Sequence, residues 1–143
     1  MKLPEAKEKF IKAWGQLGSS WGINRAMAQI HALLLIAPEP MSAEDIMKEL
    51  KMSRGNVNMN IRALINWNLV HKDLIAGERK EFFVAEKDIW KVAMLIASER
   101  RKRELEPVRR LLDKLDDVEG DKRDKHIKSF IETIKGIEDV AIK

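Results

Sequence analysis

The chain has 143 residues and 45% hydrophobic content, which is enough to bury the core of one domain without disulfides or metal. It has no cysteine, and this excludes disulfides, thiolate zinc sites and cysteine nucleophiles. The net charge of +4 is a weak indication of a nucleic-acid partner. Charges near the N-terminus argue against a signal peptide, and no apolar run is long enough to cross a bilayer, so we expect a cytoplasmic protein without a membrane partner.

Two helices are predicted in the first quarter of the chain. Residues 5–18 place four apolar side chains on one face: Phe10, Ile11, Trp14 and Leu17. Gly15 and Gly18 are expected to weaken or end this helix, and Ser19–Gly22 is expected to form a turn. Residues 24–36 form the second helix, which is apolar on most sides and is therefore predicted to be buried.

Two capped helices then follow in close succession. Ser42 and the acidic residues after it are typical of the start of a helix, here residues 43–50. Only two residues separate its end from Ser53, a second N-cap, which begins a helix over residues 53–67. Two short helices with so tight a connection, the second with a polar outer face, form the helix-turn-helix pattern.

The second capped helix has an unusual polar surface. Its apolar stripe consists of Val57, Ile61, Leu64 and Ile65. The residues off the stripe are asparagines and arginines without a carboxylate among them: Arg54, Asn56, Asn58, Asn60, Arg62 and Asn66. Asparagine lowers the stability of a helix interior, whereas Asn and Arg are the side chains that read adenine and guanine edges. We therefore interpret residues 53–67 as a DNA recognition helix.

A β-hairpin is predicted directly after this helix. Leu69–Ile75 and Glu81–Ala85 have the composition of strands, and Ala76–Lys80 is a glycine-containing turn. A hairpin in this place is a wing, so the expected fold is a mostly α winged helix-turn-helix with a two-stranded wing. Arg79 and Lys80 at its tip are predicted to contact phosphate or the minor groove, and the alternative is a solvated turn.

The rest of the chain is predicted to be helical. Its apolar stripes contain Ile89, Val92, Ala93 and Ile96, then Leu105, Val108, Leu111, Leu112 and Leu115, and finally Ile127, Phe130, Ile131, Ile134 and Ile137. Pro107 is expected to kink the helix or to open a new one, and Gly120 interrupts the pattern. The stripes are too long for a small winged helix to cover. We interpret residues 1–19 and 87–143 as dimerisation helices around a winged-helix core of about residues 20–86, all in one domain.

A basic run near the middle of these helices is a candidate second DNA surface. It consists of Arg100, Arg101, Lys102 and Arg103, with Arg109 and Arg110 further on. Because Glu99, Glu104 and Glu106 are interleaved with it, we favour a solvated helix face with ion pairs at i,i+4 spacing.

The aromatic and histidine residues allow a functional and a structural interpretation. Four tryptophans could form a cage for a quaternary ammonium ligand, but Trp14 and Trp67 are predicted to lie in the core. Trp21 and Trp90 stand at the ends of elements and are less constrained. His31 is interpreted as a satisfied core histidine, and the histidines lack metal-ligand spacing. No catalytic motif occurs, so we expect no metal, no cofactor and no enzymatic activity.

At this point a family resemblance is evident. SRGNVNMNIRALINWNLVHK…GERKEFFVAEKDIW, from Ser53 to Trp90, resembles the GbsR branch of MarR-like winged-helix transcriptional regulators. The shared features are Ser-Arg-Gly-Asn at the helix start, Asn-x-Arg-x-Leu, Trp-x-Leu-Val and Gly-Glu-Arg-Lys at the wing. With Met41–Ile46 the resemblance covers about residues 20–95. It implies a homodimeric DNA-binding regulator, usually a repressor, whose small-molecule effector is not identified because the C-terminal third diverges.

The recognition helix divides into two groups of predicted contacts. Base contacts are assigned to Arg54, Asn58, Met59 and Arg62. Ser53 and Asn56 are expected to hold phosphate together with the free helix amides, and Gly55 is expected to let the DNA backbone approach closely.

These observations define the expected function. We expect a sequence-specific regulator of double-stranded DNA, acting as a repressor, that binds a pseudo-palindromic operator as a homodimer through residues 53–67 and the wing of residues 70–85. Two alternatives stay open, a winged-helix protein–protein interaction module and a non-specific architectural DNA binder. An effector, if one exists, is expected to bind between the winged helix and the dimer helices.

Overall fold

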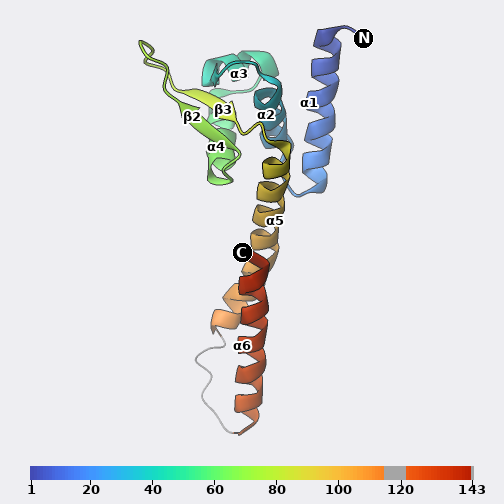
Figure 1. Ribbon diagram of the computed structural model, residues 1–143, viewed down its shortest axis with the longest axis vertical. Coiled ribbons are helices and arrows are strands. Elements are labelled where there is room, and N and C mark those ends of the chain that lie inside the picture. Colours follow the sequence, from blue (N-terminus) through green and yellow to red (C-terminus); the bar gives the residue numbers. More distant parts are fainter. Residues whose placement is uncertain (115–121, 143) are drawn as a thin grey trace. The chain divides into compact units, whose positions relative to one another are not determined.

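The computed structural model describes residues 1–114 and 122–142, which form two compact units, Met1–Leu95 and Ile96–Lys143. The elements are α1 (Leu3–Ser20), α2 (Arg25–Ile36), β1 (Met41–Ser42), α3 (Ala43–Leu50), α4 (Arg54–Asn66), β2 (Val70–Asp73), β3 (Phe82–Ala85), α5 (Ile89–Lys114) and α6 (Lys122–Ile142) (Figure 1). The predicted winged helix-turn-helix fold is confirmed. Leu115, Gly120 and the side chain of Ile137 lie outside the described residues.

The first helix is longer than the sequence indicated. α1 continues through Gly15 and Gly18 to Ser20, so the prediction that these glycines end it is wrong. Both glycines are buried, and a Cβ atom on Gly18 would stand only 2.5 Å from the Cβ atom of Ala28 in α2. They serve close packing between α1 and α2 rather than a turn. The turn is confined to Trp21 and Gly22, where Gly22 has a φ of +77°.

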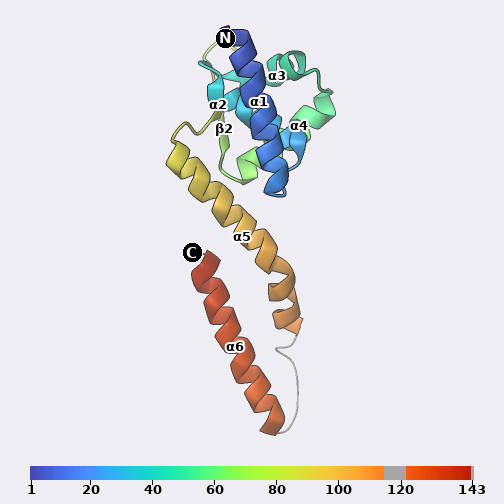
Figure 2. The ribbon, with the colours of Figure 1, turned by 90° about the vertical axis from the view of Figure 1, so that its right-hand side faces the viewer.

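α2 is the centre of the core in the first unit. It lies between α1 and the hairpin and contacts α1, α3, α4 and β3 (Figures 1 and 2). Among the side chains that are less than 2% exposed, six apolar ones come from α2, α3 and α4: Ile30, Leu33, Leu34, Ile46, Val57 and Leu64. This burial confirms the predicted inner position of residues 24–36.

The carboxyl end of α2 is held by a residue from much later in the chain. The ammonium group of Lys87 donates hydrogen bonds to the carbonyl oxygens of Leu34, Leu35 and Ala37, the last two at 2.9 and 3.0 Å. These carbonyls have no partner within the helix, because a helix leaves its last turn of acceptors unpaired. Lys87 therefore caps α2 and ties it to the segment that precedes α5.

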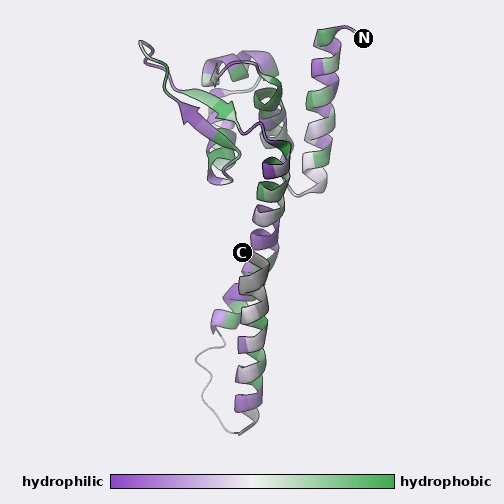
Figure 3. Ribbon diagram, in the orientation of Figure 1, coloured by the Kyte–Doolittle hydropathy of each residue, from purple (hydrophilic) through white to green (hydrophobic). Residues whose placement is uncertain are grey.

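The sheet has three strands in the order β1-β3-β2, all antiparallel. β2 pairs with β3 as the predicted hairpin, with Val70 opposite Ala85. β1 was not predicted, since its two residues pair across a long sequence separation, with Met41 opposite Phe83. β3 is thus the central strand and is hydrophobic along its length, whereas the edge strand β2 is mostly hydrophilic (Figure 3).

The long helix α5 continues through Pro107, so this proline does not open a new helix. Within the first unit Val92 is buried on α5, while Ile89 and Trp90 are exposed. In the second unit Leu112 of α5 and Ile131 of α6 are buried. In the described ranges the helices lack an apolar segment of the length that a bilayer requires.

Candidate nucleic-acid interface

The two helices of the helix-turn-helix have the caps that the sequence predicts. Ser42 Oγ accepts a hydrogen bond from the amide of Asp45 at 3.2 Å, and Asp45 Oδ2 accepts one from the amide of Ser42 at 3.0 Å. α3 ends at Lys51, which has a left-handed φ of 54° and turns the chain toward the next cap. Ser53 Oγ then accepts from the amide of Asn56 at 3.2 Å and begins α4.

Most of the residues predicted to contact DNA at the start and in the middle of α4 are exposed. Six of them are exposed: Ser53, Arg54, Gly55, Asn58, Met59 and Arg62. Asn56 is half-buried, and Val57, Ile61 and Leu64 face the core as the stripe predicted. Asn66 is also exposed, and its position four residues after Arg62 places it on the same face. The assignment of base and phosphate contacts among these residues stays a prediction.

Asn60 does not belong to this surface. Its side chain is 1% exposed and lies on the core side of α4, although its residue type grouped it with the polar series. Its Oδ1 accepts from Asn24 Nδ2 at 3.0 Å, and its Nδ2 donates to Asn56 Oδ1 at 2.8 Å. The signal that could have found this is spacing, because Asn60 stands three residues after Val57 and four before Leu64, within the apolar stripe.

Arg54 is engaged within the protein. Its two terminal nitrogens lie 3.2 and 3.3 Å from Oε1 of Glu44 on α3. The pKa of Glu44 is lowered, first by its hydrogen bond with the backbone and then by Arg54. Because both side chains are exposed, the ion pair is weak and DNA could displace the carboxylate.

The two basic residues predicted at the tip of the wing lie in the loop between β2 and β3. Arg79 and Lys80 are both exposed, and Arg79 has no carboxylate partner in the part of the chain that the structure describes. The pKa of Asp45 is lowered mainly by hydrogen bonding to the Ser42 amide and, to a smaller extent, by the Lys80 charge. Lys80 therefore acts on the start of α3, and Arg79 is the freer of the two cations.

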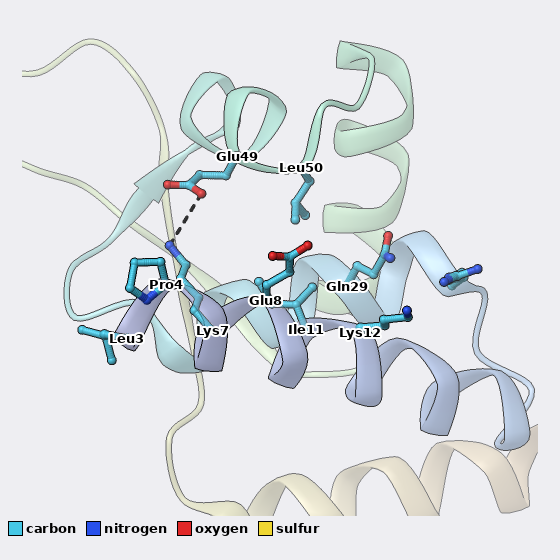
Figure 4. A pocket seen from close by; sticks show the side chains of 10 residues that line it. Leu3, Pro4, Lys7, Glu8, Ile11, Lys12, Gln29, Glu49 and Leu50 are labelled. Carbon is cyan, nitrogen blue, oxygen red and sulfur yellow. Dashed lines mark ion pairs between the residues drawn. The ribbon is translucent and has the colours of Figure 1, made fainter. Parts of the chain in front are cut away.

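Two open cavities lie between α1 and the helix-turn-helix. An ion pair of 3.6 Å joins Lys7 of α1 to Glu49 of α3, and both residues line each cavity (Figure 4). One cavity of about 670 Å³ is lined further by polar residues such as Glu8, Lys12 and Gln29. The other, of about 580 Å³, is mainly apolar and is lined by Leu3, Phe10, Leu33, Ile36, Pro38 and Met41.

The tryptophans are mostly packed into the protein. Trp14 stacks on Phe10 with a centroid distance of 5.8 Å and meets Trp21 edge-on at 6.1 Å. Trp67 is 4% exposed, which confirms its predicted core position, and Trp14 is half-buried in the ring cluster. Trp21 is less free than expected because it belongs to this cluster, whereas Trp90 is 79% exposed.

His31 is buried but only partly satisfied. Its Nδ1 accepts from the indole of Trp14 at 3.2 Å, while its Nε2 has no partner among the residues that the structure describes, so the prediction of a satisfied histidine is wrong for Nε2. Burial, and secondarily the charge of Lys87, lower the pKa of His31 to about 4. Among the described residues no three metal-ligating side chains gather into a site.

The basic run of α5 is paired as predicted. Arg100 lies 3.8 Å from Glu104, Lys102 lies 3.7 Å from Glu99, and Arg110 lies 3.2 Å from Glu106. These contacts at i,i+3 and i,i+4 spacing confirm a solvated helix face with mixed charge.

A capped pair of helices, preceded by one short strand and followed by a hairpin that completes a three-stranded sheet, defines the class of winged helix-turn-helix proteins. Residues 21–79 match the sequence model of the MarR family, so this part of the chain is similar to MarR-family proteins. It is 28% identical over 89 residues to the HTH-type transcriptional repressor GbsR of Bacillus subtilis, a match that covers 62% of this chain and 49% of that protein. The curated relatives are transcriptional regulators by name.

Two further proteins are similar to this chain. The HTH-type transcriptional regulator MmpR5 of Mycobacterium tuberculosis is 28% identical over 76 residues, 52% of this chain and 46% of that protein. The chain thus spans about half the length of the curated relatives it matches. A crystal structure of a transcriptional regulator shares the fold with a TM-score of 0.68 and 20% identity, covering 95% of this chain and 92% of that one.

Proposed function

We propose that this protein is a sequence-specific regulator of transcription, acting as a repressor in the cytoplasm, that reads double-stranded DNA with the exposed face of α4. The observation that carries the proposal is the composition of this face. It consists of amide, guanidinium and thioether side chains without a carboxylate. Amide and guanidinium groups recognise base edges, and a carboxylate would repel phosphate.

The proposed contacts follow from exposure. Asn58, Met59 and Arg62 point out from the middle of α4 and are assigned to the bases, with Arg54 joining them once it leaves Glu44. Ser53, Gly55 and Asn56 stand at the helix start, where backbone amides lack an acceptor within the helix, and are assigned to phosphate. Arg79 and Lys80 of the wing are assigned to phosphate or the minor groove.

We further propose that the protein acts as a homodimer on a pseudo-palindromic operator. Large apolar side chains are exposed on the two C-terminal helices, which supports an interface there: Met94, Val108, Leu111, Ile127 and Phe130. Two copies would set their recognition helices in successive major grooves, about 34 Å apart. This geometry predicts two half-sites about one helical turn apart.

The cavities between α1 and the helix-turn-helix are the proposed place for a small-molecule effector. They lie between a helix assigned to dimerisation and the two helices that position α4. A ligand in them regulates DNA binding only if it binds one spacing of the two recognition helices better than the other.

Selection of binding sites from random duplexes tests the proposed function. A regulator of this kind should enrich a pseudo-palindromic motif, and Arg62→Ala should then weaken binding to that motif by about 1–3 kcal/mol and relax one base position. Enrichment of no motif, with binding that depends only on salt, would favour an architectural DNA binder. Absence of DNA binding even at low salt would favour a protein–protein interaction module.

A further inference from the structure

A chain of three asparagine side chains joins the start of α2 to the start of α4. Asn24 is the N-cap of α2, Asn60 is buried in the middle of α4, and Asn56 lies in the first turn of α4. Asn24 Nδ2 donates to Asn60 Oδ1 at 3.0 Å, and Asn60 Nδ2 donates to Asn56 Oδ1 at 2.8 Å. We refer to these three residues as the asparagine relay.

The direction of the relay is set by backbone groups at both ends. The amide of Met27 can only donate, and it does so to Asn24 Oδ1 at 2.7 Å, so the NH₂ group of Asn24 must face Asn60. The carbonyl oxygen of Asn56 can only accept, and it accepts from Asn60 Nδ2 at 2.9 Å. Each side-chain amide in the relay is therefore held in one of its two flipped orientations.

At the surface end of the relay, the orientation of the side-chain amides decides which group Asn56 offers to a partner. Its Oδ1 is occupied by Asn60, and its backbone amide is occupied by Ser53. The group that Asn56 has left to offer is its side-chain NH₂, which only donates. Phosphate oxygens only accept, so this orientation fits a DNA backbone, whereas the reversed amide would turn its carbonyl oxygen toward phosphate.

We infer that Asn60 is a positioning residue for DNA binding: together with Asn24 it fixes Asn56 as a hydrogen-bond donor toward a backbone phosphate. The inference rests on the proposed function, because it concerns how a residue of that interface is oriented. It explains why a buried position in the apolar stripe of α4 carries asparagine, since an aliphatic residue of similar size would fill the space without orienting Asn56.

The test compares four proteins on the selected operator: wild type, Asn56→Ala, Asn24→Asp and the double variant. Asn56→Ala removes one neutral hydrogen bond and should weaken operator binding about fivefold. Aspartate at position 24 still caps α2, but it has no NH₂ group to give to Asn60. The relay then reverses and turns Asn56 Oδ1 outward, so Asn24→Asp should weaken binding at least as much as Asn56→Ala. Because the reversed Asn60 loses its hydrogen bond to the Asn56 carbonyl oxygen, the unfolding midpoint should fall as well, and the four affinities are compared at a temperature where all four proteins are folded.

The double variant separates orientation from charge. If Asn24→Asp acts through Asn56, it should have no further effect on affinity when position 56 is already alanine. A full additional loss in the double variant would mean that the new carboxylate repels DNA directly, and this would overturn the inference. Wild-type affinity in Asn56→Ala would overturn it as well.

A second measurement covers the case in which a variant folds poorly. In the free wild-type protein, the side-chain NH₂ protons of Asn60 should exchange slowly with water in nuclear magnetic resonance spectra, and those of Asn56 should exchange fast. Equally fast exchange at both sites would contradict the relay. Failure of the proposed function can be told apart from failure of the relay. In the first case the wild-type protein would bind no selected operator, while slow exchange at Asn60 and fast exchange at Asn56 would persist.

Discussion

Gly18 of α1 lies so close to Ala28 of α2 that a Cβ atom on the glycine would stand 2.5 Å from that of the alanine. Real Cβ atoms do not approach so closely. The Cβ atom of Ala28 is fixed to the backbone of α2, so it cannot rotate away as the end of a long side chain would. The pair therefore sets how near α1 comes to α2, and through α2 it affects the core on which the recognition helix rests.

Gly18→Ala should lower the free energy of unfolding by about 1–3 kcal/mol, because the added methyl group overpacks the contact with Ala28. Urea denaturation measures the change as a lower midpoint. Ala28→Gly in the same chain should restore part of the loss, since it removes the clashing atom. An unchanged midpoint in Gly18→Ala would mean that the two helices separate without strain.

Gly55→Ala should have the opposite effect on stability and a harmful effect on function. A Cβ atom at Gly55 meets nothing within 4 Å, so alanine should raise the free energy of unfolding by up to about 1 kcal/mol through its helix propensity. The same methyl group would stand between the start of α4 and DNA, so operator affinity should fall. Gel-shift titration measures the fall in operator affinity, and thermal melting measures the rise in stability. Unimpaired operator binding would refute a close approach of the DNA backbone to Gly55.

Lys87→Met should destabilise the fold by about 2 kcal/mol, because three carbonyl oxygens at the end of α2 lose their charged donor. Lys91→Met is the matched control, since its exposed ammonium pairs with the carboxylate of Glu86 at 3.3 Å. An exposed pair of this kind contributes little, at most about 1 kcal/mol. Lys87→Met should therefore melt at a lower temperature than Lys91→Met. Equal melting temperatures would argue against the role of Lys87 as a cap of α2.

The buried imidazole of His31 should make stability depend on pH. Its folded-state pKa of about 4 lies below the ordinary value of 6.5, so the unfolded chain binds the proton first as the pH falls. The contribution of neutral His31 to the free energy of unfolding is full above pH 6.5 and is lost progressively as the pH falls toward 4. About 2 kcal/mol of this contribution is lost between pH 7 and pH 5.

Urea denaturation at several pH values in this interval measures the effect of His31. His31→Phe should flatten the dependence, whereas His71→Gln, at an exposed position, should leave it in place. A dependence that survived His31→Phe would assign it to other groups.

The wing should contribute ionic contacts to DNA. Replacing Arg79 and Lys80 together by alanine should reduce the slope of log K against log salt by about two, because each phosphate contact releases condensed counterions. Arg110→Ala is the control, since its guanidinium is paired with Glu106 on the mixed-charge face of α5. A slope that is unaltered by the wing substitutions would leave Arg79 and Lys80 as solubilising residues.

Local signals in the sequence predicted the parts of the fold that depend on neighbours in the chain. Ser42 and Ser53 were correctly identified as caps because an N-cap acts within three residues of itself. The apolar stripe of α4 was predicted correctly for the same reason. The hairpin also followed from its own strands and turn, although the observed strands are shorter than predicted.

The errors concern residues whose role is decided by distant partners. Gly18 was interpreted as a helix breaker because Ala28, which explains it, lies on another helix. Asn60 was grouped with the polar surface, since its partner Asn24 is the cap of α2. β1 was missed because two residues have no periodicity, and only the edge of β3 makes them a strand.

Ser42 belongs both to β1, where it is paired with Phe82, and to the cap of α3. The wing and the helix-turn-helix are therefore joined at this residue, and not only through the chain between α4 and β2. If the wing contacts the DNA backbone as proposed, a displacement of the hairpin would pass through Ser42 to the start of α3, and from there to the turn that leads into α4. The hairpin would then act as a lever on the N-cap of α3, and the groove width at the wing would affect the tilt of α4.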